Sequence, residues 1–471
     1  MSEPRARIVI IGGGPGGYEA ALVAAQLGAR VTVVDRDGLG GACVLTDCVP
    51  SKTLIATSGM MAALHEAAAL GIRPSASGGG TALATVDAPR LYARVRALAR
   101  AQSEDVTARL AAEGIEVVSG TGRLADRNGR LAGPLTVEAG DVLLSADAVL
   151  VATGAQPRLL PGAEPDGERI LTFRQLYDLS ELPPELIVVG SGVTGAEFAG
   201  AYQALGSQVT LVSSRDRVLP QEDADAATVV EDVFRRRGMT VLSRSRAAAV
   251  KRDGDRVAVA LEDGRTVLGS HCLLAVGMVP NTDGLGVEEA GITLDGRGFI
   301  PVDRVSRTHA PGVYAAGDCT GVQMLASVAA MQGRIAMWHA LGEAVRPLNL
   351  SHVAATVFTE PEIAMVGVTQ RAVTSGEVDA VVGKLPLATN ARAKMQGIRD
   401  GFVKLFASPR SGRVLGGVVV APRASELILG VSLAVEQNLS VDQIAHTFAV
   451  YPSLSGSITE AARRLMQPQE N

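Results

Sequence analysis

Two stretches of the chain repeat one pattern of apolar and polar positions at an offset of 178 residues. Each begins with a short apolar run, continues through a Gly-rich turn and an Ala-rich stretch ending at Leu-Gly, and closes on a second apolar run. The copies span residues 7–35 (RIVIIGGGPGGYEAALVAAQLGARVTVVD) and 185–213 (ELIVVGSGVTGAEFAGAYQALGSQVTLVS). This order is typical of a βαβ unit with parallel strands. The repeat therefore predicts an α/β protein with two doubly wound dinucleotide-binding domains.

The pattern changes after about residue 348. The strand-like runs GFVKLFAS and VLGGVVVA are followed by the helical stretches SELILGVSLAVEQN and ITEAARRLM. Strands grouped apart from helices predict a third, C-terminal domain of α+β type. Before it, Gly and Ser at 74–80 predict an irregular excursion, and polar residues at 126–134 predict a turn.

Composition narrows the class of protein. At roughly 100–200 residues per domain, 471 residues suggest about three domains. The 47% of apolar residues can form a sizeable core, and the net charge of −5 argues against a nucleic-acid or anionic-membrane partner. No apolar run is long enough to span a bilayer, and four Cys make no disulfide framework. We therefore expect a soluble cytoplasmic protein without a targeting or integral membrane segment.

The first Gly-rich turn has the spacing of a dinucleotide site. Gly12, Gly14 and Gly17 form G-x-G-x-x-G directly after a predicted strand, so the backbone can approach a pyrophosphate at a helix N-terminus. Asp35 follows Gly12 by 23 residues and ends the second strand, where a carboxylate binds a ribose hydroxyl. A purely structural Gly-rich turn explains this combination less well.

The second turn has the same glycines without the acid. Gly190, Gly192 and Gly195 keep the spacing, but Ser213 stands where the carboxylate would be. Loss of the carboxylate removes repulsion against a 2′-phosphate, and an arginine just beyond it can pair with that group. This copy therefore accepts NADPH in our interpretation, while a role of Arg215 and Arg217 as solvated surface charges stays open.

A cysteine pair and a lysine lie close together in GGACVLTDCVPSK. On an ideal helix the Cα atoms of Cys43 and Cys48 would be roughly 8.6 Å apart, beyond disulfide reach. Pro50 cannot donate a hydrogen bond to the preceding turn, so a local distortion can bring the sulfurs together. Lys52 would favour a thiolate at Cys48. Half of a zinc site and two inert buried thiols are the alternatives, and the scattered remaining Cys and His disfavour zinc.

Taken together, these motifs resemble the flavoprotein pyridine nucleotide–disulfide oxidoreductases, the family of dihydrolipoamide dehydrogenase and glutathione reductase. GGACVLTDCVPSK resembles the redox-disulfide signature, and VATGA and GVYAAGDCTG resemble two further FAD-domain motifs. VFTEPEIAMVGVT and APRASELI resemble the C-terminal dimerisation domain. The resemblance implies an FAD domain over 1–158 and 278–348, an NAD(P) domain over 159–277 and a dimerisation domain over 349–471. It also implies a homodimer in which the partner's C-terminal domain completes each active site.

The resemblance assigns roles to individual residues. Cys48 would contact the flavin, Cys43 would exchange with a disulfide substrate, and Lys52 would lie near flavin N5 and pair with Glu197. The implied FAD contacts are Gly12, Gly14, Gly17, Asp35, Gly41, Lys52, Thr153, Gly154, Asp318, Leu325 and Ala326. The implied NADPH or NADH contacts are Gly190, Gly192, Gly195, Ser213, Ser214, Arg215 and Gly277. No metal site is expected.

One departure from the family pattern bears on the substrate. Thiol-reducing members carry a His-Pro…Glu motif near the C-terminus, and this chain has Tyr451 and Gly456 in place of the His and the Glu. A Tyr with an ordinary pKa of about 10 is a poor base at neutral pH, and loss of a general base typically costs about 10²–10⁴-fold in rate. Mercuric reductases also have a Tyr there, but this chain ends RRLMQPQEN without their terminal cysteine pair.

The remaining branch that the chain resembles is the actinobacterial NAD(P)H:quinone reductases that lack the His–Glu dyad. The leading hypothesis is an FAD-dependent NAD(P)H oxidoreductase that reduces quinones or similar acceptors with ping-pong kinetics. Two alternatives stay open. One is a disulfide reductase of the dihydrolipoamide dehydrogenase type, with Tyr451 or solvent as proton carrier. The other is a non-enzymatic flavin-bearing subunit of a larger complex.

Overall fold

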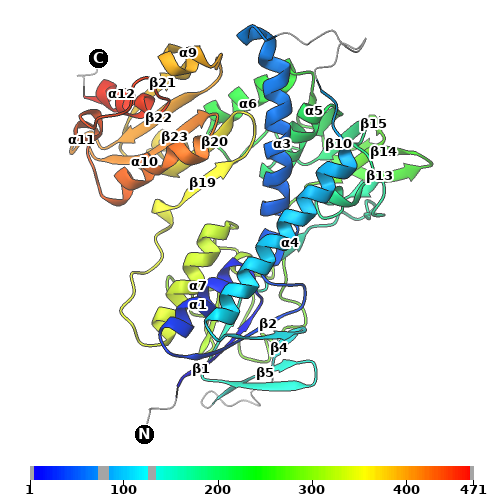
Figure 1. Ribbon diagram of the computed structural model, residues 1–471, viewed down its shortest axis with the longest axis vertical. Helices are drawn as coiled ribbons and strands as arrows, with labels where there is room; N and C mark the ends of the chain where they lie inside the picture. Colours follow the sequence, from blue (N-terminus) through cyan, green and yellow to red (C-terminus); the bar gives the residue numbers. More distant parts are fainter. Residues whose placement is uncertain (1–4, 73–83, 126–133, 467–471) are drawn as a thin grey trace. The chain divides into compact units, whose positions relative to one another are not determined.

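The structure is a computed structural model that describes residues 5–72, 84–125 and 134–466. The excursion expected at 74–80 and all but the last residue of the turn expected at 126–134 lie outside these ranges. The chain forms two compact units (Figure 1). Unit 1 consists of Met1–Thr53, Tyr92–Arg158 and Gly277–Asn349, and unit 2 of Leu54–Leu91, Leu159–Val276 and Leu350–Asn471. This division groups the chain differently from the three domains expected from the sequence, whose boundaries stay a prediction.

Unit 1 is built on a five-stranded parallel sheet of order β18-β7-β1-β2-β3. Its strands are β1 (Arg7–Ile11), β2 (Arg30–Asp35), β3 (Glu116–Ser119), β7 (Ala148–Val151) and β18 (Val313–Ala315). The strand order reverses between β1 and β7, which is where doubly wound sheets bind their ligands. The α/β architecture expected from the first copy is therefore confirmed.

Strand alternation sends the apolar side chains of β1 to both faces of this sheet. Ile8 and Ile10 pack on one face against α1 (Pro15–Gln26), α7 (Ala326–Ala340) and the C-terminal half of α4 (Ala88–Ala112). Val9 and Ile11 pack on the other face. That face is covered by an antiparallel sheet of β4 (Gly122–Leu124), β5 (Leu135–Ala139) and β6 (Val142–Ala146), together with residues 285–300.

The remaining elements of unit 1 are short. They are α2 (Gly41–Leu45), the start of α3 (Cys48–Glu66), and β8 (Ala155–Pro157) paired with β17 (Met278–Pro280). The 3₁₀ turn η3 (Asp318–Thr320) follows β18.

Unit 2 contains a second parallel sheet of order β12-β11-β10-β16-β9. Its strands are β9 (Ile170–Leu171), β10 (Glu185–Val189), β11 (Gln208–Val212), β12 (Thr240–Leu242) and β16 (His271–Leu274), with the helices α5 (Val193–Leu205) and α6 (Ala224–Arg236). An antiparallel sheet of β13 (Ala247–Asp253), β14 (Arg256–Leu261) and β15 (Thr266–Gly269) shares its core. The β10–α5–β11 segment is the second copy of the repeat and has the topology of the first.

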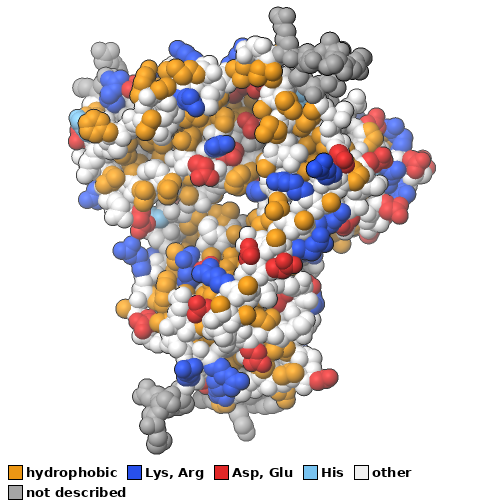
Figure 2. Space-filling view, viewed as in Figure 1, with side chains coloured by type: hydrophobic (Ala, Val, Ile, Leu, Met, Phe, Trp, Pro, Cys, Tyr) orange, Lys and Arg blue, Asp and Glu red, His pale blue; other side chains and the backbone are white. Residues whose placement is uncertain are grey.

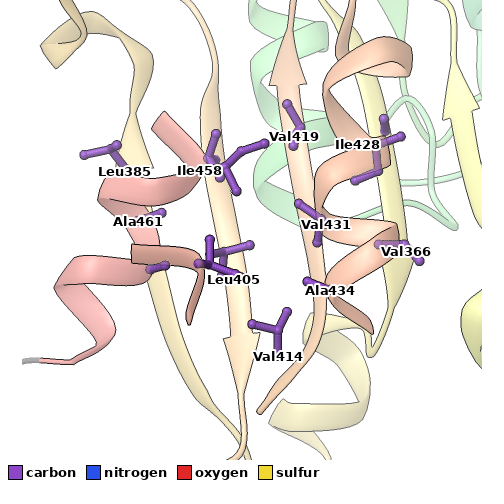
Figure 3. Close-up of a cluster of buried hydrophobic side chains, with 14 of the residues drawn as sticks. Val366, Leu385, Leu405, Val414, Val419, Ile428, Val431, Ala434, Ile458 and Ala461 are labelled. Atoms are coloured by element: carbon purple, nitrogen blue, oxygen red, sulfur yellow. The ribbon is translucent and has the colours of Figure 1, made fainter. Parts of the chain in front are cut away.

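The C-terminal part of unit 2 is an antiparallel sheet of order β19-β20-β23-β22-β21 packed against helices. The strands are β19 (Ala354–Val357), β20 (Glu362–Gly367), β21 (Val381–Pro386), β22 (Phe402–Ala407) and β23 (Val414–Ala421). The helices are α8 (Gln370–Thr374), α9 (Ala391–Met395), α10 (Ala424–Glu436), α11 (Val441–Ala445) and α12 (Gly456–Leu465). Figure 3 shows Val419, Val431 and Ile458 meeting in the core between them. This is the expected α+β domain.

Helices α1 and α7 of unit 1 touch backbone to backbone, side by side in Figure 1. A Cβ atom on Gly333 of α7 would lie 2.0 Å from the carbonyl oxygen of Gly16 on α1. Any side chain at this point forces the helices apart, because packed interiors yield little. The contact fixes how closely α7 covers the start of α1.

We expect Gly333→Ala to destabilise the protein by about 1–3 kcal/mol, the usual cost of overpacking. Gly59→Ala is the matched control, because Gly59 lies inside α3 and no described atom would lie within 4 Å of its Cβ. That substitution should stabilise the helix by about 0.5–1 kcal/mol. Thermal unfolding midpoints check both signs, and a Gly333→Ala protein as stable as wild type would contradict the close packing.

Candidate functional site

The first Gly-rich turn permits two contacts that no side chain would allow. A Cβ atom on Gly12, at a φ of +104°, would lie 2.3 Å from the carbonyl oxygen of Ala152, and one on Gly17 would lie 1.9 Å from that of Gly12. Gly14 is the N-cap residue of α1 and supplies no side-chain cap. Pro15 at the start of α1 has no amide, and the amides of Gly17 and Tyr18 donate to the Gly14 carbonyl. The Gly16 amide is therefore the one left for a ligand such as a pyrophosphate. Gly41 comes equally close, because its Cβ would lie 2.8 Å from the Gly14 Cα.

Asp35 is fixed beside this turn by backbone donors. Its carboxylate accepts hydrogen bonds from the amides of Gly13 at 2.6 Å, Asp37 at 2.9 Å and Gly38 at 2.6 Å. These donors hold a partly exposed carboxylate at the end of β2, with lone pairs left for a ribose hydroxyl.

Asp318 is a half-buried carboxylate at the start of η3. Burial, with a contribution from the charge of Asp47, raises its pKa to about 6. No side-chain hydrogen bond or ion pair joins it to another residue within the described ranges. A half-buried carboxylate without a protein donor leaves room for a ligand hydroxyl to donate to it. This residue and the glycine turn fit FAD.

The other residues expected to contact FAD lie in the same unit. Thr153 and Asn281 exchange hydrogen bonds, since the Thr153 hydroxyl donates to the Asn281 carbonyl at 2.7 Å and the Asn281 amide returns one at 2.9 Å. Gly154 follows at a φ of +70°. Leu325 and Ala326 are the N-cap and first residue of α7.

Cys43 and Cys48 lie on two different helices. Helix α2 ends at Leu45 and α3 begins at Cys48, and the amide of Asp47 reaches back to the carbonyl of Ala42 at 2.8 Å. The local distortion expected around the pair is therefore present. Both sulfurs are thiols in the structure and share a hydrogen bond.

The shared hydrogen bond shifts the pKa values of the two thiols in opposite directions. It lowers the pKa of Cys43 and raises that of Cys48, while burial and the charge of Asp47 raise both and Lys52 lowers both. The shared hydrogen bond therefore makes Cys43 the more acidic thiol of the pair.

The second Gly-rich turn repeats the first. A Cβ on Gly190 would lie 2.1 Å from the Ala275 carbonyl oxygen, and one on Gly195 would lie 1.9 Å from that of Gly190. Gly192 is the N-cap residue of α5 without a side-chain cap, and no described atom would lie within 4 Å of its Cβ. The N-terminus of α5 can therefore receive a second pyrophosphate. Gly277, at a φ of +103°, follows β16.

Ser213 contributes to this site indirectly. The side chain is fully buried, and its Oγ lies 2.7 Å from the Oγ of Ser191 and accepts a hydrogen bond from the Arg215 amide at 3.1 Å. The exposed residues beside it are Ser214 and Arg215. Ser191 was not predicted from the sequence. Its position between Gly190 and Gly192 was the available signal, because the corresponding residue of the first copy, Gly13, lies next to the acidic position.

The residues that directly follow Ser213 carry a net positive charge, because Arg215 and Arg217 flank a single acid, Asp216. Asp216 is paired with Arg244 at 2.8 Å, which offsets its negative charge. Arg215 has no side-chain partner within the described ranges, and the buried Nε of Arg217 has no hydrogen-bond partner there either. The stretch directly after Ser213 therefore carries an excess of positive charge.

The remaining candidates lie on unit 2. Glu197 on α5 is buried, and its Oε1 accepts a hydrogen bond from the amide of Phe358 at 2.8 Å, a contact that no sequence pattern signals. Its pairing with Lys52 stays a prediction. Tyr451 is 84% exposed next to a cis peptide bond to Pro452. His446, five residues before Tyr451, is exposed and bonded within its own turn to Asp442.

Two absences concern the described residues alone. No group of three His, Cys, Asp or Glu in them is arranged to hold a metal ion. None of the helices in the described ranges combines the length and apolarity needed to cross a membrane.

Comparisons with known proteins agree with this geometry. The family model described as pyridine nucleotide-disulphide oxidoreductase matches residues 6–333, and the model of its dimerisation domain matches residues 353–462. The chain is 58% identical to an NAD(P)H dehydrogenase (quinone) of Mycobacterium tuberculosis, over 98% of this chain and 94% of that protein. It is 33% identical to a dihydrolipoyl dehydrogenase of Zymomonas mobilis, over 96% of both. The crystal structure of LpdA from M. tuberculosis superposes with a TM-score of 0.93 at 57% identity, covering 98% of this chain and 100% of that one.

We expect Cys48→Ala to raise the pKa of Cys43, because the substitution removes the hydrogen bond that favours its thiolate. Labelling of the reduced protein by iodoacetamide should then need a higher pH, since only the thiolate reacts. Cys48→Ser is the matched control, because its hydroxyl can still donate. Cys272 and Cys319 are buried with raised pKa values and should contribute no background. An unchanged or lower midpoint in Cys48→Ala would show that the shared hydrogen bond does not set the acidity.

Proposed function

The chain belongs to the pyridine nucleotide–disulphide oxidoreductase family, and from this we propose that it is an FAD-dependent NAD(P)H oxidoreductase that reduces quinones. The observation that carries the choice of acceptor is the missing His–Glu dyad. Tyr451 stands in place of the base, and Gly456, whose amide binds the Ser453 hydroxyl at 3.1 Å, stands in place of the carboxylate. The similarity to the quinone-acting relative supports the same assignment.

In this proposal FAD lies along the first Gly-rich turn. The start of α1 would hold the pyrophosphate, Asp35 would bind ribose hydroxyls, and Asp318 would accept a hydrogen bond from the cofactor. When bound, FAD supplies the chemistry that accepts a hydride from NAD(P)H and passes electrons to an acceptor. Lys52 would stabilise negative charge near the reacting atoms.

Quinone and disulfide acceptors differ in whether the protein must supply an acid–base group for their reduction. A disulfide substrate needs a group that gives a proton to its leaving thiolate and takes one from the thiol in the reverse step, and a tyrosine hydroxyl is a poorer acid–base group for this than an imidazole. A quinone has no thiol to activate. The Cys43–Cys48 pair, though able to undergo redox chemistry, is then dispensable for turnover.

We expect the FAD-loaded protein to turn over menadione faster than lipoamide by roughly 10²–10⁴-fold, the usual contribution of a general base. Cys43→Ser should leave menadione turnover within about twofold, because quinone reduction uses no thiol exchange. The measurement is steady-state turnover with menadione, lipoamide and glutathione disulfide. Tyr451→His with Gly456→Glu is the gain-of-function variant and should raise lipoamide turnover.

Other outcomes of this panel identify the competing functions. Equal rates with lipoamide and menadione, or loss of quinone turnover in Cys43→Ser, would favour a disulfide reductase of the dihydrolipoyl dehydrogenase type. Absence of turnover with every acceptor would favour a flavin-bearing subunit of a larger complex.

We further propose that NADPH is used at least as well as NADH. The buried hydroxyl pair of Ser191 and Ser213 presents no carboxylate to repel a 2′-phosphate, and Arg215 and Arg217 are available to bind one.

Replacing both arginines (Arg215→Gln with Arg217→Gln) should lower kcat/KM for NADPH by about 10–100-fold, the cost of one or two charge-assisted hydrogen bonds. The value for NADH should change by less than about twofold, because NADH lacks the 2′-phosphate. Arg256→Gln is the matched control, since Arg256 is exposed on the same unit and pairs with Glu185 at the first residue of β10, the strand end opposite to the turn. Equal losses with both coenzymes would contradict recognition of the 2′-phosphate.

We also propose a cytoplasmic homodimer. Phe448, Val450 and Tyr451 form one exposed apolar segment, and Leu429 and Leu433 stand one turn apart on the exposed face of α10. Hydrophobic side chains are visible on the surface of this C-terminal part in Figure 2, viewed as in Figure 1. Exposed apolar sets of this kind mark protein interfaces, and the dimerisation-domain match favours a second copy of the chain. The low cysteine count favours a reducing compartment.

A further inference from the structure

A buried lysine of the C-terminal sheet holds the start of helix α6. Lys404 on β22 is 1% exposed. Its Nζ donates to Asp223 Oδ1 at 3.0 Å and Oδ2 at 2.8 Å, and lies 2.8 Å from Asp225 Oδ2. The charge is thus fully paired, which is the condition for keeping an ammonium group in a protein interior.

Asp223 also caps the N-terminus of helix α6. It is the N-cap residue of α6, and its Oδ1 accepts hydrogen bonds from the amides of Asp225 at 3.1 Å and Ala226 at 3.2 Å. Because the side chain of Asp223 is only 3% exposed, its orientation depends on the lysine that neutralises it.

The segment that leads into Asp223 carries the two candidate phosphate-binding arginines. This segment runs from Ser213 to Glu222, and hydrogen bonds connect it to helix α6 and to the Gly-rich turn. Val218 donates to Glu231 at 2.9 Å, and Leu219, at a φ of +52°, donates to the Ser191 carbonyl at 2.8 Å. Lys404 holds Asp223, the residue that directly follows this segment.

We propose that Lys404 is a positioning residue for coenzyme selectivity, setting the place of Arg217 through Asp223. This rests on the proposed use of NADPH. Without the ammonium group, the buried Asp223 carboxylate is unpaired and turns toward water, which loosens the start of α6. Glu231 on α6 then no longer holds the Val218 amide, and Arg217 next to it loses its fixed place. Leu219 stays bonded to the Gly-rich turn, which keeps its place together with α5.

The test compares Lys404→Met with Lys384→Met in the FAD-loaded protein. Lys384 also pairs with Asp225, at 2.9 Å, but its side chain is 41% exposed, so its loss leaves no buried charge. Lys404→Met should raise KM for NADPH and the calorimetric Kd for NADP⁺ by about tenfold, the loss of one charge-assisted contact. KM for NADH, Kd for NAD⁺ and kcat with either coenzyme should stay within about twofold, and Lys384→Met should match wild type throughout.

Lys404→Met combined with Asp223→Ala provides a second variant if Lys404→Met alone does not fold. The combination leaves no unpaired buried charge at position 223, while the start of α6 loses its N-cap. It should give the same split between NADPH and NADH. Equal weakening of both coenzymes, a fall in kcat alone, or the same effect in Lys384→Met would overturn the proposal and reduce Lys404 to a structural ion pair. A wild-type protein that binds NAD⁺ but not NADP⁺ would contradict the proposed use of NADPH before any variant is compared.

Discussion

Both Gly-rich turns depend on one close contact. In each, a glycine in the first turn of the helix packs against the carbonyl oxygen of the glycine that follows the preceding strand. The Cβ that a side chain would add at Gly17 or at Gly195 would lie 1.9 Å from the carbonyl oxygen of Gly12 or of Gly190. Only glycine allows this approach, and the approach brings the start of α1 and the start of α5 to the mouth of each sheet. The reversal of strand order beside β1 and β10 then makes room for a ligand at the same place.

The parts that a local steric rule governs could be predicted from the sequence. The glycine spacing, the strands that flank it and the later change to an α+β pattern each follow from residues close together in the chain. Pro50 correctly indicated a break near the cysteines, although the break lies at Thr46 and Asp47 and the proline itself falls in the first turn of α3, where a missing amide costs nothing.

The parts that depend on distant residues could not be predicted. No periodicity links Lys404 to Asp223, which lie 181 residues apart, or the amide of Phe358 to Glu197. The raised pKa of Asp318 is a consequence of burial, which the motif GVYAAGDCTG does not state. The roles of Ser213 and Ser191 likewise emerge only when two strand ends are placed next to each other.

The two copies of the repeat differ at one pair of facing positions. In the first copy Gly13 faces Asp35, and a Cβ on Gly13 would lie 3.1 Å from the carboxylate oxygen. In the second copy Ser191 faces Ser213, and their hydroxyls fill the same space. A carboxylate introduced at position 213 would meet the Ser191 side chain, which has no counterpart at Gly13. Rebuilding the arrangement of the first copy in the second therefore takes two replacements, Ser191→Gly together with Ser213→Asp.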